Sequence, residues 1–333
     1  MTDDLPGLDL ESLERYLDRA RPELVQGPLR ATRIHGGMSN LTYLVTDGVT
    51  RWVIRRPPMG HLSDTAHDMR REYRVIDALR RTKVPVPPPV LLCEDPAVLG
   101  APFQITGFVD GTAHHHVGTL EAVGPVRTRR IMFQLVETLA DLHAVDFAEV
   151  GLADHGRVGG FLQRQMRRWN RHLDAAPDSR PAGIDRLSEA LTRAIPATSS
   201  TTIVHGDYRL GNVLVDDAGG TGIDQITALL DWEMSTLGDP LTDLGLMILH
   251  TGLSASGDRP ASAVPGHPAV EDLLKRYAIR SGRDLDAMSW YIAFSAFKLA
   301  VVLEGVQRRS TEVTPVTGLI PVLIEYGLTT VRR

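Results

Sequence analysis

The fold is decided by HGDYRLGN at residues 205–212 and by LDWEMSTLGDPLTDLG at residues 230–245. Short apolar runs beside polar turns predict loop, strand, turn, strand and loop across this region. Asn212 follows Asp207 by five residues, and a hairpin would return Asp231 to the same edge, so three oxygen-bearing side chains can converge. Phosphoryl transfer from ATP needs a carboxylate near the acceptor hydroxyl and hard oxygen ligands for Mg²⁺. The pattern therefore predicts a phosphotransferase site, with the alternative that Asp207 and Asp231 are turn residues beside strands.

The chain before this region has the pattern of a small antiparallel sheet. Alternation of apolar and polar residues predicts strands at residues 31–35, 41–47 and 51–56. Tyr73, Ile76 and Leu79 recur at helical spacing within residues 69–80, which predicts one helix packed on the sheet.

A proline-rich stretch, residues 84–111, favours two further strands and a connector. From Val126 onward the pattern becomes mainly helical. We therefore expect an N-terminal lobe of residues 1–107, which includes a leading helix, and a C-terminal lobe of residues 108–333.

The composition suits a two-part globular protein. The 333 residues, 43% hydrophobic and 23% charged, are enough for two lobes. The net charge of -5 argues against duplex DNA as a partner, and Cys93, the only cysteine, excludes an intramolecular disulfide and a thiolate zinc site. The acidic N-terminal segment does not resemble a signal peptide, and the apolar stretch 288–303 is interrupted by Lys298. We expect a cytoplasmic protein that binds neither nucleic acid nor a membrane.

Two further patterns each have a functional and a structural interpretation. Gly36, Gly37, Ser39 and Asn40 lie in a turn between two predicted strands, where backbone amides could approach nucleotide phosphates; the alternative is an ordinary hairpin loop. The three histidines at residues 114–116 suggest a metal site, but adjacent side chains converge poorly on one ion, so we expect a solvated loop.

Asp239 and Asp243 belong to the segment GDPLTDLG. We expect them to cap and brace the helix that begins there, because Asp is favoured at helix starts.

Taken together, these motifs resemble the aminoglycoside phosphotransferase family, whose members are relatives of the protein kinases. Within that family the chain is most similar to the kinase-like domains related to the N-terminal part of acyl-CoA dehydrogenase family members 10 and 11. The resemblance is carried by GGMSNLTYLV, VIRRPP, LHAVDFAEVGL, RQMRRW, HGDYRLGN, LDWEMSTLGDPLTDLG and FKLAVVLEGVQRR. It implies an α/β, protein-kinase-like two-lobed fold, with ATP and Mg²⁺ as cofactors.

The resemblance also implies roles for the residues of the catalytic segment. Asp207 would orient the acceptor hydroxyl and receive its proton, and Asn212 and Asp231 would bind the metal. An Asp has an unperturbed pKa of about 3.9, so positioning, with late proton transfer, describes Asp207 better than outright deprotonation. His205 would brace the loop. Arg209 would face the transferred phosphate or form a structural ion pair.

In the first lobe the resemblance implies a basic residue on the third strand, paired with an acid on the next helix, that holds the phosphates. Arg55 and Glu72 occupy these places, and Arg55 replaces the usual Lys. A guanidinium can still bind phosphate, but with a different reach. The adenine would lie near Gln104, Thr106 and Phe108.

A basic helix face bears on the acceptor. Within FLQRQMRRWNRHL, four arginines fall at i, i+3, i+4 and i+7: Arg164, Arg167, Arg168 and Arg171. Lys298, Arg308 and Arg309 add positive charge later in the lobe. We expect the four arginines to form a basic rim for an anionic acceptor; the alternative is a solvated helix face paired with acids. The resemblance to the acyl-CoA-dehydrogenase-associated domains implies a hydroxyacyl-CoA or similar thioester.

Three other functions compete with this interpretation. An aminoglycoside or macrolide phosphotransferase would share the catalytic segment. A nucleotide-binding pseudokinase is disfavoured by intact Asp207, Asn212 and Asp231. A protein kinase is disfavoured because no DFG or APE motif follows Asp231.

Overall fold

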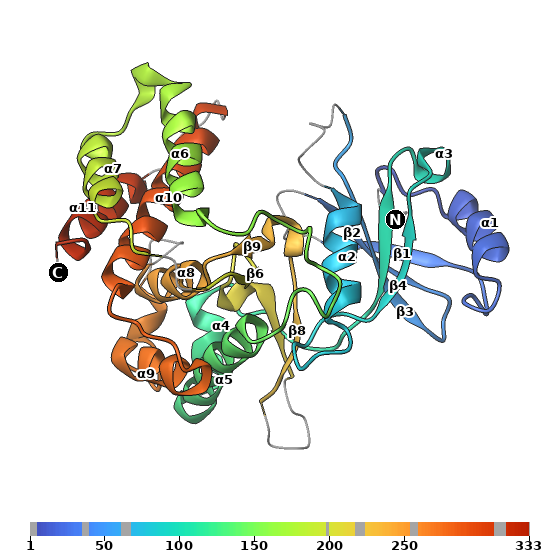
Figure 1. Cartoon of the computed structure of the whole chain (residues 1–333). Helices are drawn as coiled ribbons and strands as arrows, with labels where there is room; N and C mark the ends of the chain where they lie inside the picture. The colour runs from blue at the N-terminus through green and yellow to red at the C-terminus, as the bar shows by residue number, and fades with distance from the viewer. Residues whose placement is uncertain are drawn as a thin grey trace. The chain divides into compact units, whose positions relative to one another are not determined.

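The computed structural model describes residues 5–34, 40–60, 68–197, 200–216, 224–253, 259–309 and 318–332. The chain forms two compact units (Figure 1). The first unit comprises Met1–Asp110 and Thr227–Glu233, and the second comprises Gly111–Ile226 and Met234–Arg333. The short return of the chain into the first unit was not expected from the sequence, and it places Asp231 in that unit.

The first unit is built on a five-stranded antiparallel sheet with the strand order β1-β2-β3-β5-β4. The strands are β1 (Arg30–Ile34), β2 (Leu41–Thr46), β3 (Arg51–Arg56), β4 (Pro89–Cys93) and β5 (Phe103–Gly107), and the helices are α1 (Leu10–Ala20), α2 (Met69–Leu79) and α3 (Pro96–Leu99). Asp68 starts α2, since its carboxylate accepts hydrogen bonds from the backbone N–H groups of Arg70 and Arg71. The three predicted strands and the helix after them are confirmed, while α3 was not predicted.

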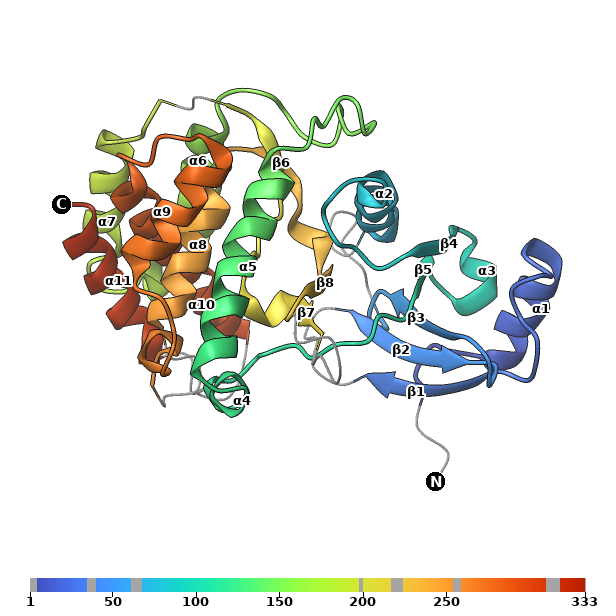
Figure 2. The same ribbon diagram turned by 90° about the horizontal axis from the view of Figure 1, so that it is seen from below.

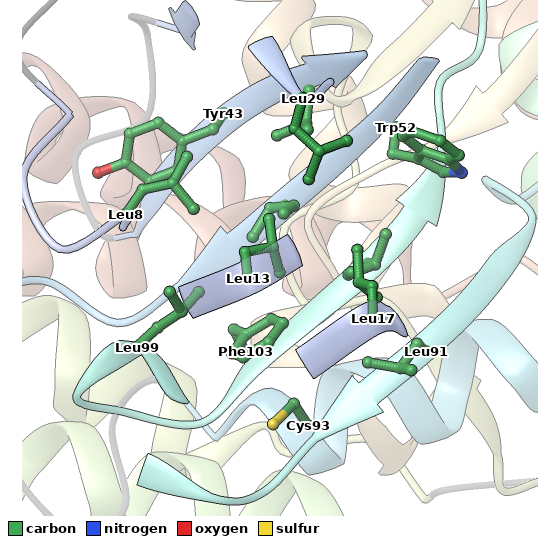
Figure 3. Close-up of a cluster of buried hydrophobic side chains, with 13 residues drawn as sticks. Leu8, Leu13, Leu17, Leu29, Tyr43, Trp52, Leu91, Cys93, Leu99 and Phe103 are labelled. Atoms are coloured by element: carbon green, nitrogen blue, oxygen red, sulfur yellow. The ribbon is translucent and has the colours of Figure 1, made fainter. Parts of the chain in front are cut away.

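The apolar core of the first unit lies between α1 and one face of the sheet (Figure 3). Leu13 and Leu17 come from α1 and are buried against Tyr43, Trp52 and Phe103 of the sheet. The spacing of two between inward residues of each strand is the alternation that a half-buried strand requires. Burial of this apolar surface is what fixes α1 on the sheet.

The same alternation sends the two adjacent arginines of β3 to opposite faces. Arg56 lies on the α1 side, where its guanidinium donates to the backbone carbonyls of Gly7, Pro57 and Leu99 (Nη1 to the Leu99 oxygen, 2.7 Å). Arg55 lies on the other face and meets Glu72 of α2. Because Arg56 donates to backbone carbonyls, Arg55 is the better candidate of these two arginines for ligand chemistry.

The second unit is mainly helical and contains a short two-stranded sheet, β6-β9. Its helices are α4 (Val117–Ala122), α5 (Pro125–His143), α6 (Phe161–Asp174), α7 (Ile184–Arg193), α8 (Leu241–Gly252), α9 (Val270–Ser281), α10 (Met288–Arg309) and α11 (Leu319–Thr330); its strands are β6 (Thr202–Val204), β7 (Val213–Val215) and β9 (Thr236–Gly238). Strand β8 (Ile226–Leu229) lies where the chain passes into the first unit. β9 was expected to be a loop.

Helix α10 is the central helix of this unit and packs against α8 and α11 (Figures 1 and 2). Among the described residues it is the one helix long and apolar enough to span a membrane by length and composition, but 61% of that stretch is buried inside the protein. Core helices of globular units have the same composition. Lys298, which interrupts the apolar stretch in the sequence, lies within this helix.

Truncation of a buried aromatic should test the core of the first unit. We expect Phe103→Ala to lower the free energy of unfolding by about 3–5 kcal/mol, because a fully buried ring leaves a cavity. Val49, 73% exposed in the same unit, provides the control: Val49→Ala should change stability by less than about 0.5 kcal/mol. Urea unfolding measures both, and equal effects of the two substitutions would contradict this packing.

Candidate active site

The catalytic segment, residues 205–212, follows β6 and begins with a tight turn whose backbone conformation favours glycine. Gly206 has a φ of +86°, and a Cβ there would lie 2.6 Å from the backbone oxygen of Met234. A Cβ on Gly211 would lie 2.7 Å from Nη1 of Arg209. The two glycines therefore bring the backbone and the charged side chains of residues 205–212 closer together than other residues allow.

Asp207 is held through one carboxylate oxygen. Its Oδ2 accepts hydrogen bonds from Nδ2 of Asn212 at 2.8 Å and from Nε of Arg209 at 3.3 Å. Among the described residues no hydrogen bond to the Oδ1 atom is recorded, and the side chain is 29% exposed. Asp207 can therefore offer Oδ1 to a hydroxyl while Oδ2 fixes its orientation.

The charges around Asp207 keep it ionised. Burial alone would raise its pKa, but Arg209, His205, His250 and the Asn212 hydrogen bond together lower it. The guanidinium of Arg209 is thus an ion-pair partner of Asp207 in this structure, the second of the two roles that the sequence allowed.

The buried carboxylate of Asp243, which lies outside the motif HGDYRLGN, holds the catalytic segment in place. Asp243 of α8 accepts hydrogen bonds from the backbone N–H groups of His205 (2.6 Å) and Gly206 (2.9 Å). His143 lies behind it, with Nε2 3.4 Å from Asp243 Oδ2 and Nδ1 2.7 Å from the hydroxyl of Tyr277. Because a carboxylate only accepts, Nε2 carries the His143 proton and Nδ1 accepts from Tyr277. Asp243 therefore braces residues 205–212, whereas the sequence led us to expect that it would cap and brace the helix that begins nearby.

The neighbouring Asp239 has the predicted capping role. Its Oδ1 accepts from the backbone N–H of Leu241 at 3.0 Å, in the first turn of α8, and its Oδ2 accepts from the Tyr291 hydroxyl at 2.9 Å. His205 is fully buried, and its Nδ1 accepts from the backbone N–H of Asp207 at 3.2 Å. His205 thus makes the bracing contact that the sequence predicted for it.

In the first unit, Arg55 lies between two acids. Its Nη1 is 3.0 Å from Glu72 Oε1, and its Nη2 is 3.3 Å from Asp231 Oδ1. Burial, together with the charges of Asp231 and Glu233, raises the pKa of Glu72 to about 7 against the opposite effect of Arg55. The predicted pairing of Arg55 with Glu72 is present, and the contact with Asp231 is an addition that the sequence did not indicate.

Asp231 is the one non-glycine residue of the described chain with a positive φ, +66°. Such a backbone conformation costs an ordinary residue about 1–3 kcal/mol and is concentrated at functional sites. Nearby, Asn40 donates from Nδ2 to Glu233 Oε2 at 3.1 Å, and its buried Oδ1 has no hydrogen-bond partner. The first unit thus collects hard oxygen atoms around Asp231.

The oxygen atoms of the predicted metal-binding residues, Asn212 and Asp231, are of the kind that binds Mg²⁺. Asn212 turns its Nδ2 toward Asp207, which leaves its carbonyl Oδ1 as the atom available for a cation. Asp231 contributes a carboxylate that is 30% exposed. Mg²⁺ is commonly held by one or two protein oxygens together with substrate phosphates. Among the described residues, no group of three or more His, Cys, Asp or Glu side chains is placed so that it could hold a metal ion.

The residues predicted near the adenine lie on or after β5. Gln104 and Thr106 are buried, and the Gln104 amide lies close enough to the Glu72 carboxyl to lower its pKa. Phe108 is covered by the guanidinium of Arg51, 4.3 Å from the ring centre. The predicted phosphate loop, Gly36, Gly37 and Ser39, lies outside the described residues, apart from Asn40.

On the basic face of α6, one predicted acceptor-binding residue, Arg164, has a different role in the structure. Arg164 donates to the carbonyl of Arg157 at 2.6 Å and to that of Gly159, so it closes the loop before its own helix. It is therefore not available to an acceptor in this structure. Arg167, Arg168 and Arg171 are exposed as predicted.

Two other predictions about basic residues can be compared with the structure. His114 is 4% exposed, so the loop of three histidines is not wholly solvated, whereas His115 and His116 are exposed. Arg308 lies 3.7 Å from Glu304 on the same helix and is exposed. The side chain of Arg309 lies outside the described residues.

Sequence reasoning missed His250 of α8, which influences Asp207, Arg209 and Lys298 electrostatically. Burial lowers the pKa of His250 to about 4, so this imidazole is neutral near pH 7. A single histidine within the apolar run LGLMILH gave no signal of its position. For Asp243 the signal was present in GDPLTDLG, but its partner could not be read from the sequence.

Comparisons with known proteins identify the family and the fold of the chain. The sequence model of the phosphotransferase enzyme family matches residues 30–291. Acyl-CoA dehydrogenase family member 10 of Mus musculus is 33% identical over 307 residues, which are 90% of this chain but 28% of that protein. An aminoglycoside phosphotransferase-like protein of Ralstonia eutropha JMP134 is 30% identical, with a TM-score of 0.82 and coverage of 97% and 98% of the two chains.

A choline kinase from Cryptosporidium parvum Iowa II shares the fold at 13% identity, with a TM-score of 0.63 and coverage of 97% of this chain and 96% of that one. The predicted kinase-like fold is confirmed by these structural similarities, with a small antiparallel sheet in one unit and helices in the other.

The raised pKa of Glu72 predicts a pH-dependent stability. Because the folded-state value of about 7 exceeds the ordinary 4.5, ionisation of Glu72 costs stability as pH rises between these values. We expect the wild-type protein to lose stability relative to Glu72→Gln by as much as about 3 kcal/mol from pH 4.5 to pH 7.5. Urea unfolding at several pH values measures this difference. Glu325→Gln, at an exposed position on α11, is the control. If the stability difference between wild type and Glu72→Gln changes with pH as little as the difference between wild type and Glu325→Gln, the raised pKa of Glu72 is contradicted.

Proposed function

Because the chain belongs to the phosphotransferase enzyme family, we propose that it transfers the γ-phosphoryl group of ATP to a hydroxyl of a small molecule. The observation that carries the proposal is the Asp207 carboxylate, which is fixed at Oδ2 by Asn212 and Arg209 and offers Oδ1. A positioned carboxylate of this kind is the group that phosphoryl transfer to an alcohol requires.

Asp207 acts mainly by orientation. The acceptor hydroxyl donates to Asp207 Oδ1, and its oxygen forms the new bond to phosphorus as the bond to the β-phosphate oxygen breaks. The hydroxyl proton passes to Asp207 late in this step, since the lowered pKa makes the carboxylate a weak base. ADP leaves with the bridging oxygen, and the product is a phosphate monoester.

The nucleotide and Mg²⁺ are assigned to residues of both units. Arg55, held by Glu72, binds phosphate oxygens, and its contact with Asp231 is exchanged for them. Asp231 and Asn212 are the residues that would hold Mg²⁺, and the metal would neutralise the charge of the phosphates. Gln104, Thr106 and Phe108 remain the predicted adenine contacts, and Gly36, Gly37, Ser39 and Asn40 the predicted phosphate loop.

The acceptor is proposed to be anionic, with a hydroxyacyl-CoA thioester as the leading class. Support comes from Arg167, Arg168 and Arg171, which expose three cations on α6. The relatives named for acyl-CoA dehydrogenases point to the same class of molecule, although this chain spans only 28% of the length of the one in mouse.

Substitution of the positioning carboxylate tests the function. We expect Asp207→Asn to lower kcat at least about 100-fold while ATP still binds, because the carboxylate orients the acceptor and does not hold the nucleotide. Coupled ADP release measures turnover, and calorimetry measures nucleotide affinity. Near-normal turnover by Asp207→Asn would overturn the assignment.

A companion substitution separates the metal role from the catalytic role. Asp231→Asn should weaken Mg²⁺-dependent nucleotide binding, since a charged metal ligand becomes neutral. Glu325→Gln, exposed and remote in sequence from both motifs, should behave as wild type in both assays. An unchanged Mg²⁺ titration for Asp231→Asn would remove this residue from the metal site.

The charge of the acceptor is tested by a substrate panel. We expect hydroxyacyl-CoA thioesters to be phosphorylated in preference to kanamycin-like polycations, and the KM of the thioesters to rise with ionic strength because exposed arginines are screened. Steady-state kinetics between low and 0.5 M salt measures the trend. Efficient turnover of an aminoglycoside would overturn the acceptor class and leave phosphoryl transfer standing.

A further inference from the structure

Lys298 of α10 lies against the catalytic segment of the second unit. Its Nζ donates a hydrogen bond of 2.7 Å to the backbone carbonyl of Gly206, the residue immediately before Asp207. No other hydrogen bond of Nζ, and no carboxylate within ion-pair distance, is recorded among the described residues. An ammonium has three N–H donors. Two donors of Lys298 are therefore available beside Asp207.

The surroundings of Lys298 carry an excess of positive charge. Asp243 is one of its two acidic neighbours, but its carboxylate already binds the backbone of His205 and Gly206. Asp207, the other, already pairs with Arg209. Arg168 of α6 adds another positive charge.

Two residues complete these surroundings. His250 of α8 is half-buried and contributes no charge near pH 7. The ammonium of Lys298 is itself half-buried, and burial lowers its pKa. A partly buried cation without a close carboxylate is costly, and an electron-rich ligand would relieve that cost.

We propose that Lys298 is an acceptor-binding residue that determines specificity, because it presents two N–H donors next to the carboxylate that positions the reactive hydroxyl. The inference rests on the proposed phosphotransferase function and adds to it the group that recognises the acceptor. The ligand class is an electron-rich oxygen, a carboxylate or thioester carbonyl, carried near the hydroxyl that is phosphorylated.

The same residue excludes a class of acceptors. A lone carboxylate such as Asp207 would attract ammonium groups of amino alcohols and aminoglycosides. With Lys298 and Arg209 both near Asp207, an acceptor that carries an ammonium beside its hydroxyl meets like charge. Specificity thus comes from attraction of acceptors that carry an electron-rich oxygen and from repulsion of acceptors that carry an ammonium group.

The test compares Lys298→Met, which keeps most of the stem and removes the charge, with Lys298→Arg and with the control Lys275→Met. Lys275 is exposed on α9. Each variant is assayed with MgATP on 3-hydroxybutyryl-CoA and on ethanolamine, and ATP affinity is measured separately. We expect Lys298→Met to raise the KM for the thioester about 10- to 100-fold, the range for one charged hydrogen bond, with ATP affinity within about twofold.

The ratio of kcat/KM between the two acceptors separates recognition from loop support. Loss of the Gly206 contact alone would lower kcat on both acceptors equally, whereas loss of recognition shifts the ratio toward ethanolamine in Lys298→Met. Lys298→Arg should retain the wild-type ratio. An unchanged ratio in Lys298→Met, with wild type active, would overturn the inference. No phosphoryl transfer by wild type to either acceptor or to the wider panel would instead be a failure of the proposed function.

A binding measurement gives a second readout without turnover. The chain has only three lysines, Lys83, Lys275 and Lys298, so protein labelled with ¹³C at the lysine ε-carbon gives signals that the Lys→Met variants assign. Saturating 3-hydroxybutyryl-CoA should shift the Lys298 signal and leave Lys275 unmoved. A thioester that is phosphorylated but leaves the Lys298 signal in place would contradict the proposal.

Discussion

The geometry of the catalytic segment depends on the two hydrogen bonds that Asp243 accepts from the backbone of His205 and Gly206. Charged hydrogen bonds of this kind contribute about 1.5–3 kcal/mol each, and here they fix the residue before Asp207 in a left-handed conformation. Burial alone would raise the pKa of Asp243, but the hydrogen bond from His143 and the loop amides lowers it, so the brace stays ionised. Asp207 and Asn212 follow that anchored turn, and Lys298 of α10 donates to its Gly206 carbonyl.

In the first unit, one basic side chain lies between two acidic side chains. Arg55 is held between Glu72 and Asp231, so one guanidinium bridges two carboxylates. Under the proposed function, the phosphates of a nucleotide would take the place of Asp231 on Arg55, and Mg²⁺ would take the place of Arg55 on Asp231. The positive φ of Asp231 is a backbone conformation that costs an ordinary residue about 1–3 kcal/mol.

The sequence predicted the sheet and the helix α2, because alternation and helical spacing are local properties of the chain, and the kinase-like fold was implied by the resemblance of its motifs to the aminoglycoside phosphotransferase family. It did not predict the strand β9, whose pairing with β6 joins residues far apart in the chain. Arg164 was misassigned since its partners, the carbonyls of residues 157 and 159, are set by loop closure. His250 and the contact of Lys298 with Gly206 depend on packing of α8 and α10, which no single-sequence pattern encodes.

The most direct test of phosphoryl transfer to a hydroxyl is the chemical identity of the product. ³¹P NMR of the purified protein with MgATP and a hydroxyacyl-CoA panel should show loss of the γ-phosphate signal and growth of a phosphate-ester signal coupled to the proton on the acceptor carbon, in step with ADP. Growth of inorganic phosphate alone, at the same rate with and without acceptor, would contradict the account.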